Sequence, residues 1–160
     1  MTFQIHALPA EPFAPLFDLT EAELAARAIH RSTVRDCPGT PCRVSLEDAQ
    51  PGETVLLLNH THQPAQTPYR SSHAIFVRQG AAQARPAPGV VPEMIQRRLI
   101  SLRLFDANNM MIDADVIDGQ AVASALDSAF SSQQVAYAHL HIAKPGCFAA
   151  SVTRTPVGAI

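Results

Sequence analysis

The stretch from Leu99 to Arg154 constrains the fold more than any other part of the sequence. Apolar and polar residues alternate with period two in LISLRLF (99–105) and in MMIDADVI (110–117), with a DANN turn between them. Apolar residues at positions i, i+3, i+4, i+7 and i+8 then indicate an amphipathic helix over 122–130. Two further strand patterns follow at 135–142 and 147–154. This β-β-α-β-β order predicts an antiparallel sheet whose apolar face is covered by the helix.

The first half of the chain carries weaker strand signals and one well-marked helix start. Short strands are predicted at 3–8, 42–46, 53–60 and 73–78. Thr20 and Glu23 form a capping-box pattern, which predicts a helix from this point to about Arg31. The segment 80–92 is rich in Ala, Pro and Gly and would connect two halves. We therefore predict one α+β domain over residues 1–160, with a mainly antiparallel sheet and two principal helices.

Composition and charge exclude several classes of partner. The formal net charge is -2, with 16% charged and 47% hydrophobic residues, which gives no electrostatic reason to expect nucleic acid. Arg97, Arg98 and Arg103 are the nearest approach to a basic cluster, but they are too few and too interleaved with apolar residues to form a basic stripe. No apolar run approaches the ~20 residues of a membrane helix, and no secretory signal precedes the first strand. We expect a cytoplasmic protein with no membrane partner and with its three cysteines reduced.

The segment HLHIAKPGC (139–147) is the first candidate site. Strand alternation places Tyr137, His139 and His141 together on the face away from the helix. A five-residue hairpin loop would set His141 opposite Cys147, and a register shift of two residues would leave them diagonal. Because thiolate is the reactive form of cysteine, a neighbouring imidazolium makes His141 and Cys147 a candidate catalytic pair, with His139 and Tyr137 orienting it. The alternative is that Cys147 is a small buried apolar residue.

A second candidate is the loop NHTHQPAQTPYRSSHAIF (59–76), which offers donors suited to an anion. Arg70 supplies a guanidinium, and an anionic group held by Arg70 and Arg43 is our hypothesis. The alternative is a solvated loop. The candidate ligand-binding residues are Arg43, His62, Tyr69, Arg70, Ser71, Ser72, His73 and Tyr137.

A metal site would need a third ligand beside His139 and His141. His62, His73, Asp113 and Cys147 are the alternatives, and none of them is indicated by spacing. We therefore predict that the protein holds no metal. The sequence indicates no particular cofactor.

Three segments together resemble a known family: CRVSLEDAQPGETVLLL, HQPAQTPYRSSHAIFVR and HLHIAKPGC. They are similar to a small bacterial family catalogued as domain of unknown function number 1203. The resemblance extends from LPAEPFAPLF to GCFA and implies no activity. The positions that carry it are Cys42, Arg43, His62, Gln63, Tyr69, Arg70, His139, His141, Gly146, Cys147 and Phe148.

The function we expect is the binding of a small, anionic molecule between the 60–73 loop and the helix-free sheet face. The sequence leaves open whether the protein is also an enzyme. One alternative is a non-catalytic interaction module that forms a homodimer through the same face, and a third is a metal-dependent hydrolase. An enzyme requires a concave pocket with convergent polar groups, whereas a dimer module buries a flatter and more apolar patch.

Overall fold

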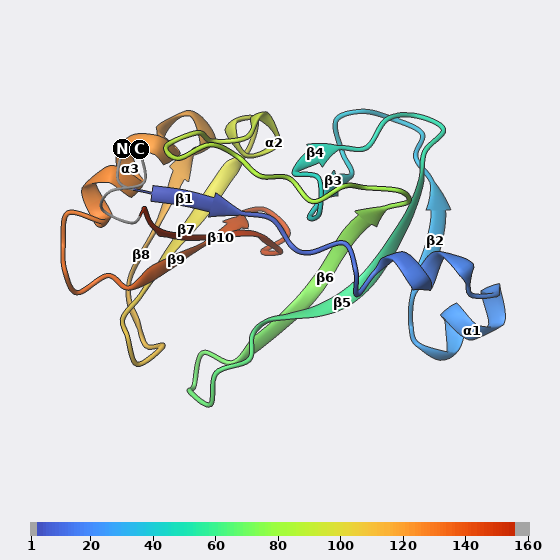
Figure 1. Cartoon of the computed structure of the whole chain (residues 1–160), viewed down its shortest axis with the longest axis horizontal. Coiled ribbons are helices and arrows are strands. Elements are labelled where there is room, and N and C mark those ends of the chain that lie inside the picture. Colours follow the sequence, from blue (N-terminus) through green and yellow to red (C-terminus); the bar gives the residue numbers. More distant parts are fainter. Residues whose placement is uncertain (1–2, 156–160) are drawn as a thin grey trace.

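Two five-stranded sheets make up the protein in a computed structural model that describes residues 3–155 (Figure 1). The strand orders are β1-β10-β9-β7-β8 in one sheet, called sheet A, and β2-β5-β6-β3-β4 in the other, called sheet B. Neighbouring strands are antiparallel except β3 and β6. The predicted α+β class with mainly antiparallel pairing is therefore confirmed, with its strands divided between two sheets.

Sheet A contains the first strand and the C-terminal part of the chain. Its strands are β1 (Phe3–His6), β7 (Leu99–Phe105), β8 (Met111–Asp118), β9 (Tyr137–Ile142) and β10 (Phe148–Arg154). The helix α3 (Val122–Ala129) follows the short 3-10 turn η2 (Gly119–Ala121). Val122 and Leu126 of α3 are fully buried in one apolar core with Ala138 and Leu140 of β9. The predicted β-β-α-β-β order is confirmed.

Sheet B is built from the segment before the long connection. Its strands are β2 (His30–Thr33), β3 (Pro41–Cys42), β4 (Glu47–Asp48), β5 (Thr54–Gln63) and β6 (Ser71–Arg78). A second core lies against this sheet, under the 3-10 helix η1 (Ala14–Asp18) and α1 (Glu21–Ala26). The predicted strand at 42–46 is shorter than expected: Leu46 adopts φ 52, and its N–H donates to Cys42, so the chain turns after β3.

The capping box of α1 is confirmed. The Thr20 side chain accepts a hydrogen bond from the Glu23 N–H, and the Glu23 carboxylate accepts one from the Thr20 N–H. The helix ends at Ala26, earlier than the predicted Arg31. Ala28 adopts a left-handed φ of 54, and the Ile29 N–H donates to the Leu24 carbonyl, which ends the helix and leads into β2.

The segment from Gln79 to Pro92 joins the two sheets without forming a helix or strand, as predicted for 80–92. Two backbone hydrogen bonds hold it in place: Ala84 donates to Val44, in the turn between β3 and β4, and Gly89 donates to Phe3 of β1. The short helix α2 (Glu93–Gln96) then leads into β7. Among the described residues no helix has the length and apolar character needed to span a membrane.

Candidate functional site

The β9–β10 hairpin has a register different from the predicted one. Phe148 is paired with His141, and the Ile142 N–H donates to the Cys147 carbonyl at 2.8 Å. The turn is therefore Ala143–Gly146, one residue shorter than expected, with Gly146 in the left-handed region at φ 82. The prediction that His141 lies opposite Cys147 is wrong, because Phe148 occupies that position.

Beyond a β-bulge the hairpin adopts the alternative register, which is shifted by two residues from the one that pairs His141 with Cys147. Ala150 is paired with Leu140 and Ser151 with His139, so Ala149 is the additional residue of β10. One extra residue in a strand reverses which of its side chains point to each face of the sheet. In β10 this reversal affects only the residues between the turn and the bulge. His139 therefore lies on the face away from α3, as predicted. Cys147 does not share that face and belongs to the core under α3.

The helix-free face of sheet A is covered by β5 of sheet B. His62 of β5 meets both histidines of β9: its ring centroid lies 4.8 Å from His141 and 6.1 Å from His139. The Phe148 ring stacks on His62 at 5.3 Å and contacts the other two rings edge-on. We call His62, His139 and His141 the histidine cluster. The structure thus brings together three of the predicted site residues between the two sheets.

The histidines of this cluster are held neutral by their surroundings. Burial, with a smaller contribution from nearby titratable and cationic groups, lowers the pKa of His139 and of His62 to about 4. Burial lowers the pKa of His141 to about 3, although its hydrogen bond to Gly146 opposes the shift. Arg103, paired with His139 across the β7–β9 ladder, lowers the pKa of all three imidazoles by charge repulsion.

Each ring of the cluster retains one buried nitrogen without a hydrogen-bond partner. Nδ1 of His141 donates to the Gly146 carbonyl at 3.0 Å, which leaves Nε2 unpartnered. Nε2 of His62 lies 2.9 Å from the Ser71 hydroxyl, and Nδ1 is unpartnered, as is Nδ1 of His139. In the described part of the chain, no group of three His, Cys, Asp or Glu is arranged to hold a metal ion. The cluster is a packed seam of neutral rings between the sheets.

Cys147 is in contact with a buried arginine and not with a histidine. Arg43, 1% exposed, follows β3 and is held by a hydrogen bond from its N–H to the Phe76 carbonyl. Its Nη2 donates to Cys147 Sγ at 2.8 Å, its Nε donates to the Phe148 carbonyl at 2.7 Å, and its Nη1 donates to the Pro41 carbonyl. Burial lowers the pKa of Arg43, and the adjacent Cys147 opposes that shift. Arg43 has no carboxylate partner among the described residues.

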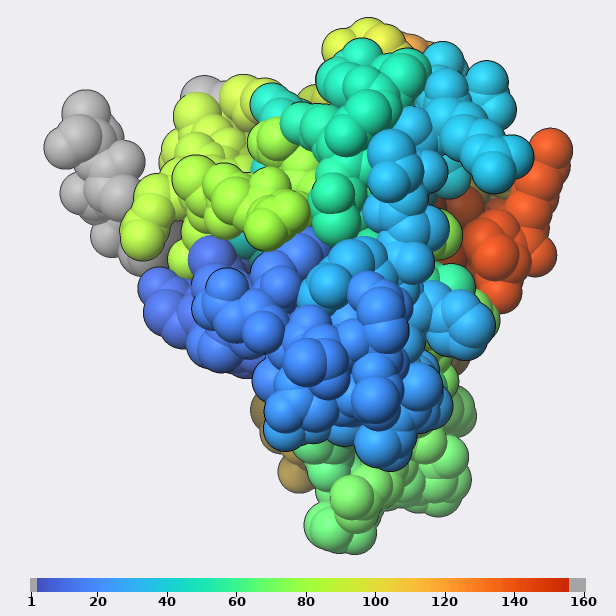
Figure 2. All heavy atoms as spheres, turned by 90° about the vertical axis from the view of Figure 1, so that its right-hand side faces the viewer, coloured from blue at the N-terminus to red at the C-terminus, as the bar shows by residue number. Residues whose placement is uncertain are grey.

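A cleft of about 470 Å³ opens beside this pair, and we call it the basic cleft. Its cationic or titratable basic side chains are Arg43, His73, Arg97, Arg98 and Lys144. Its apolar wall includes Leu57, Phe76, Leu99 and Ile142, and Cys147 also lines it. No Asp or Glu occurs among the described residues that line the cleft. In the space-filling view the orange-red turn between β9 and β10 protrudes beside the light-blue segment between β2 and β3, and both border this cleft (Figure 2).

Two of the cleft arginines are partly neutralised by carboxylates that do not line the cleft. Arg98 donates to both carboxylate oxygens of Asp48, at 2.9 and 2.6 Å, and Asp48 is almost fully buried. Arg97 pairs with Glu93 at 2.6 Å and lies 3.9 Å from Asp48. Lys144 is exposed on the β9–β10 turn and makes no ion pair with any described residue. The cleft therefore keeps an excess of positive charge.

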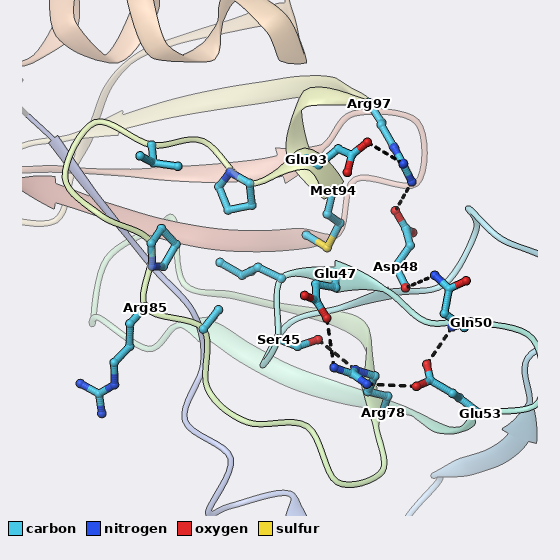
Figure 3. A pocket seen from close by; sticks show the side chains of 15 residues that line it. Ser45, Glu47, Asp48, Gln50, Glu53, Arg78, Arg85, Glu93, Met94 and Arg97 are labelled. Carbon is cyan, nitrogen blue, oxygen red and sulfur yellow. Dashed lines mark hydrogen bonds and ion pairs between the residues drawn. The ribbon is translucent and has the colours of Figure 1, made fainter.

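A larger pocket of about 640 Å³ lies on the other side of Arg97 and Asp48 (Figure 3). Its charged side chains include four carboxylates and three arginines. Arg78 is held there by Glu47 and Glu53 at 3.1 and 3.0 Å. Because these charges compensate one another, this pocket has no comparable preference for an anion.

The remaining predicted ligand-binding residues do not converge on one site. The hydroxyl of Tyr137 donates to the Asn109 side chain and accepts from Gln63, each at 2.8 Å. Tyr69 packs edge-on against Phe105 at 6.4 Å. Arg70 and Ser72 are exposed, and Ser71 contacts His62. Of the PYRSSH segment, only His73 reaches the basic cleft, where Arg43 also lies.

Sequence reasoning missed the role of three cations in this cleft. Arg97 and Arg98 were visible as an adjacent pair, but they come after the long connection and far in sequence from Arg43. Lys144 was visible only as a turn residue. The Arg-Arg pair was the available signal, and only the packing of α2 beside β4 connects it to the cleft.

The residues that build both regions fall within one family match. A family model described as a protein of unknown function (DUF1203) matches residues 39–154. The chain belongs to this family. The DUF1203 match includes Arg43, the histidine cluster and Cys147. No curated protein and no solved structure was found to be similar to the chain.

Proposed function

We propose that this protein binds a small molecule carrying a carboxylate or phosphate group in the basic cleft. The observation that carries the proposal is the cleft lining, which contains three arginines and a lysine and no acidic side chain among the described residues. A concave surface lined by one sign of charge raises the local concentration of oppositely charged ligands. Arginine also matches the geometry of carboxylate and phosphate oxygens through paired N–H groups.

The rest of the lining supports a ligand larger than a simple ion. A volume of about 470 Å³ falls in the range of about 300–1,000 Å³ that is typical of small-molecule sites. Leu99, which is 45% exposed, and the neighbouring Ile142 and Phe76 provide an apolar surface beside the cations. A ligand with an anionic end and an apolar body would satisfy both parts of the cleft.

The ligand would lie in the basic cleft and not against the histidine face expected from the sequence. The helix-free face is already covered by β5 within the chain, with His62 against His139 and His141. The three cysteines are free thiols, which fits a reducing compartment, and we propose a cytoplasmic location on that basis.

Calorimetric titration with inorganic phosphate and with citrate at low salt tests the proposal. We expect saturable binding that Lys144→Gln weakens about fivefold, because an exposed charge contact contributes about 1 kcal/mol. Arg27→Gln is the matched control, since Arg27 is exposed and does not line the basic cleft. Absence of binding, or equal weakening by the two variants, would overturn the proposed function.

A further inference from the structure

We infer that Cys147 is the site of covalent chemistry in the basic cleft: its sulfur displaces a leaving group from a carbon of a ligand whose carboxylate or phosphate group is held by the cleft cations. The thiol proton is lost to water, a C–S bond forms, the bond from carbon to the leaving group breaks, and the leaving group departs with the bonding electron pair. The inference rests on the proposed anion binding and adds a reaction to it. It also replaces the predicted pairing of Cys147 with His141 by a contact with Arg43.

The position of Cys147 meets the geometric requirement. It follows Gly146 at the end of the β9–β10 turn, is 6% exposed, and lines the cleft. Lys144 lies in the same turn, and Arg97 and Arg98 line the same cleft. An anionic group bound by these cations would therefore hold the rest of the ligand close to the sulfur, which raises the effective concentration of an electrophile there.

The charge beside the sulfur meets the electrostatic requirement. The thiolate is the nucleophilic form of cysteine, so negative charge must be carried on sulfur before it attacks. Nη2 of Arg43 lies 2.8 Å from Sγ and has no competing carboxylate among the described residues. The guanidinium is itself held by the Phe148 and Pro41 carbonyls, so it is positioned before any ligand arrives.

The other two cysteines have different surroundings and serve as internal references. Cys42 is fully buried, and its sulfur accepts hydrogen bonds from the backbone N–H groups of Ser45 and Arg78 at 3.5 and 3.4 Å. Cys37 is exposed, and the amide of Gln50 donates to its sulfur at 3.3 Å. Only Cys147 combines a guanidinium contact with a place in the basic cleft.

Two alkylating reagents of nearly equal size, one anionic and one neutral, test this inference. In each case the thiolate sulfur attacks the CH2 carbon, a C–S bond forms, the C–I bond breaks, and iodide leaves with the bonding electron pair. Iodoacetate carries a carboxylate and iodoacetamide is neutral. The rate ratio between the two reagents therefore measures recognition of the anion at each sulfur.

Alkylation rates at neutral pH are measured for each cysteine by peptide mass spectrometry on the intact, folded chain. We expect the iodoacetate-to-iodoacetamide ratio at Cys147 to exceed that at Cys37 by about tenfold, as expected for a ligand concentrated by a charged cleft. Lys144→Gln should lower the ratio at Cys147 and leave it unchanged at Cys37, whereas Arg27→Gln should change neither. Equal ratios at Cys147 and Cys37, or Cys147 reacting slowest of the three with both reagents, would overturn the inference.

Titration of Cys147→Ser with inorganic phosphate separates this inference from the proposed function. The variant keeps the cations of the cleft and lacks the thiol. If it binds phosphate while wild-type Cys147 shows no preference for iodoacetate, the covalent role is wrong and anion binding stands. If neither the variant nor the wild-type protein binds phosphate, the proposed function is wrong and the inference that rests on it is overturned with it.

Discussion

The carbonyl of Phe148 accepts a 2.7 Å hydrogen bond from Nε of Arg43, while its ring stacks on His62 in the histidine cluster. Phe148 therefore packs against the histidine cluster with its ring and holds the buried guanidinium of Arg43 with its carbonyl. It reaches both because the bulge at Ala149 turns its side chain toward sheet B.

Replacing Arg43 by lysine should destabilise the protein. A lysine ammonium cannot reach two carbonyls and a sulfur in the planar arrangement that the guanidinium uses. Leaving buried carbonyls without donors should cost about 2–4 kcal/mol in the free energy of unfolding. Urea denaturation of Arg43→Lys measures this, with the exposed Arg27→Lys as control. A loss equal to that of the control would show that these contacts contribute nothing to stability.

Truncating Phe148 should open a cavity between the sheets. The side chain is 3% exposed and contacts the rings of His62, His139 and His141. Phe148→Ala should cost about 3–5 kcal/mol, and Phe148→Leu roughly half as much, because leucine fills part of the volume. Thermal or urea unfolding gives the comparison. Val116→Ala, at a position 56% exposed, should change stability little, and a similar loss there would contradict the packing argument.

Stability should fall in mild acid because of the histidine cluster. The pKa of His139 is lowered to about 4 and that of His141 to about 3, from 6.5, so the unfolded chain binds protons that the folded chain does not. The free energy of unfolding is therefore highest above pH 6.5 and decreases as the pH falls from 6.5 toward 4. Each unit of difference corresponds to about 1.4 kcal/mol, and the partly buried His62 contributes less because solvent screens it.

Urea unfolding as a function of pH measures this dependence. His141→Phe removes one titrating ring and should flatten the decrease. His30→Gln is the control, since His30 is exposed on β2 and lies outside the cluster. An unchanged slope in His141→Phe would show that the acid sensitivity originates elsewhere.

Gly119 should tolerate no side chain. A Cβ at this position would lie 2.6 Å from the carbonyl oxygens of Gln96 and Arg98 and still closer to that of Ile95. Backbone atoms cannot move aside as a flexible side chain can, so Gly119→Ala should cost at least about 1–3 kcal/mol. Gly39→Ala is the matched control because its Cβ would meet nothing within 4 Å. Equal melting temperatures for the two variants would refute the close packing of η2 on α2.

The purified protein should contain no stoichiometric zinc. His141 already donates through Nδ1 to Gly146, the Phe148 ring stacks on His62, and no three donors among the described residues are arranged around a common position. Elemental analysis after purification without chelator tests this. About one zinc per chain, lost in His62→Gln, would contradict the expectation and would turn the cluster into a metal site.

Local patterns in the sequence predicted the C-terminal strands and helix, the start of α1 and part of the site. The Thr20–Glu23 capping box predicts the start of α1 because its hydrogen bonds connect residues only three positions apart. The alternation along β9 places His139 and His141 together because strand geometry has period two. The apolar spacing in 122–130 predicts the buried face of α3 for the same kind of reason.

Only the tertiary structure decided what those residues contact. A bulge at Ala149 moved Cys147 off the histidine face, and no local pattern indicates such a bulge, since the residues on either side keep the alternation of a regular strand. Docking of the two sheets brought His62 to His139 and brought Arg43, Arg97 and Lys144 to one cleft. These contacts join residues far apart in sequence and depend on the combined packing of two cores, so periodicity and spacing determined the elements and long-range packing determined the sites.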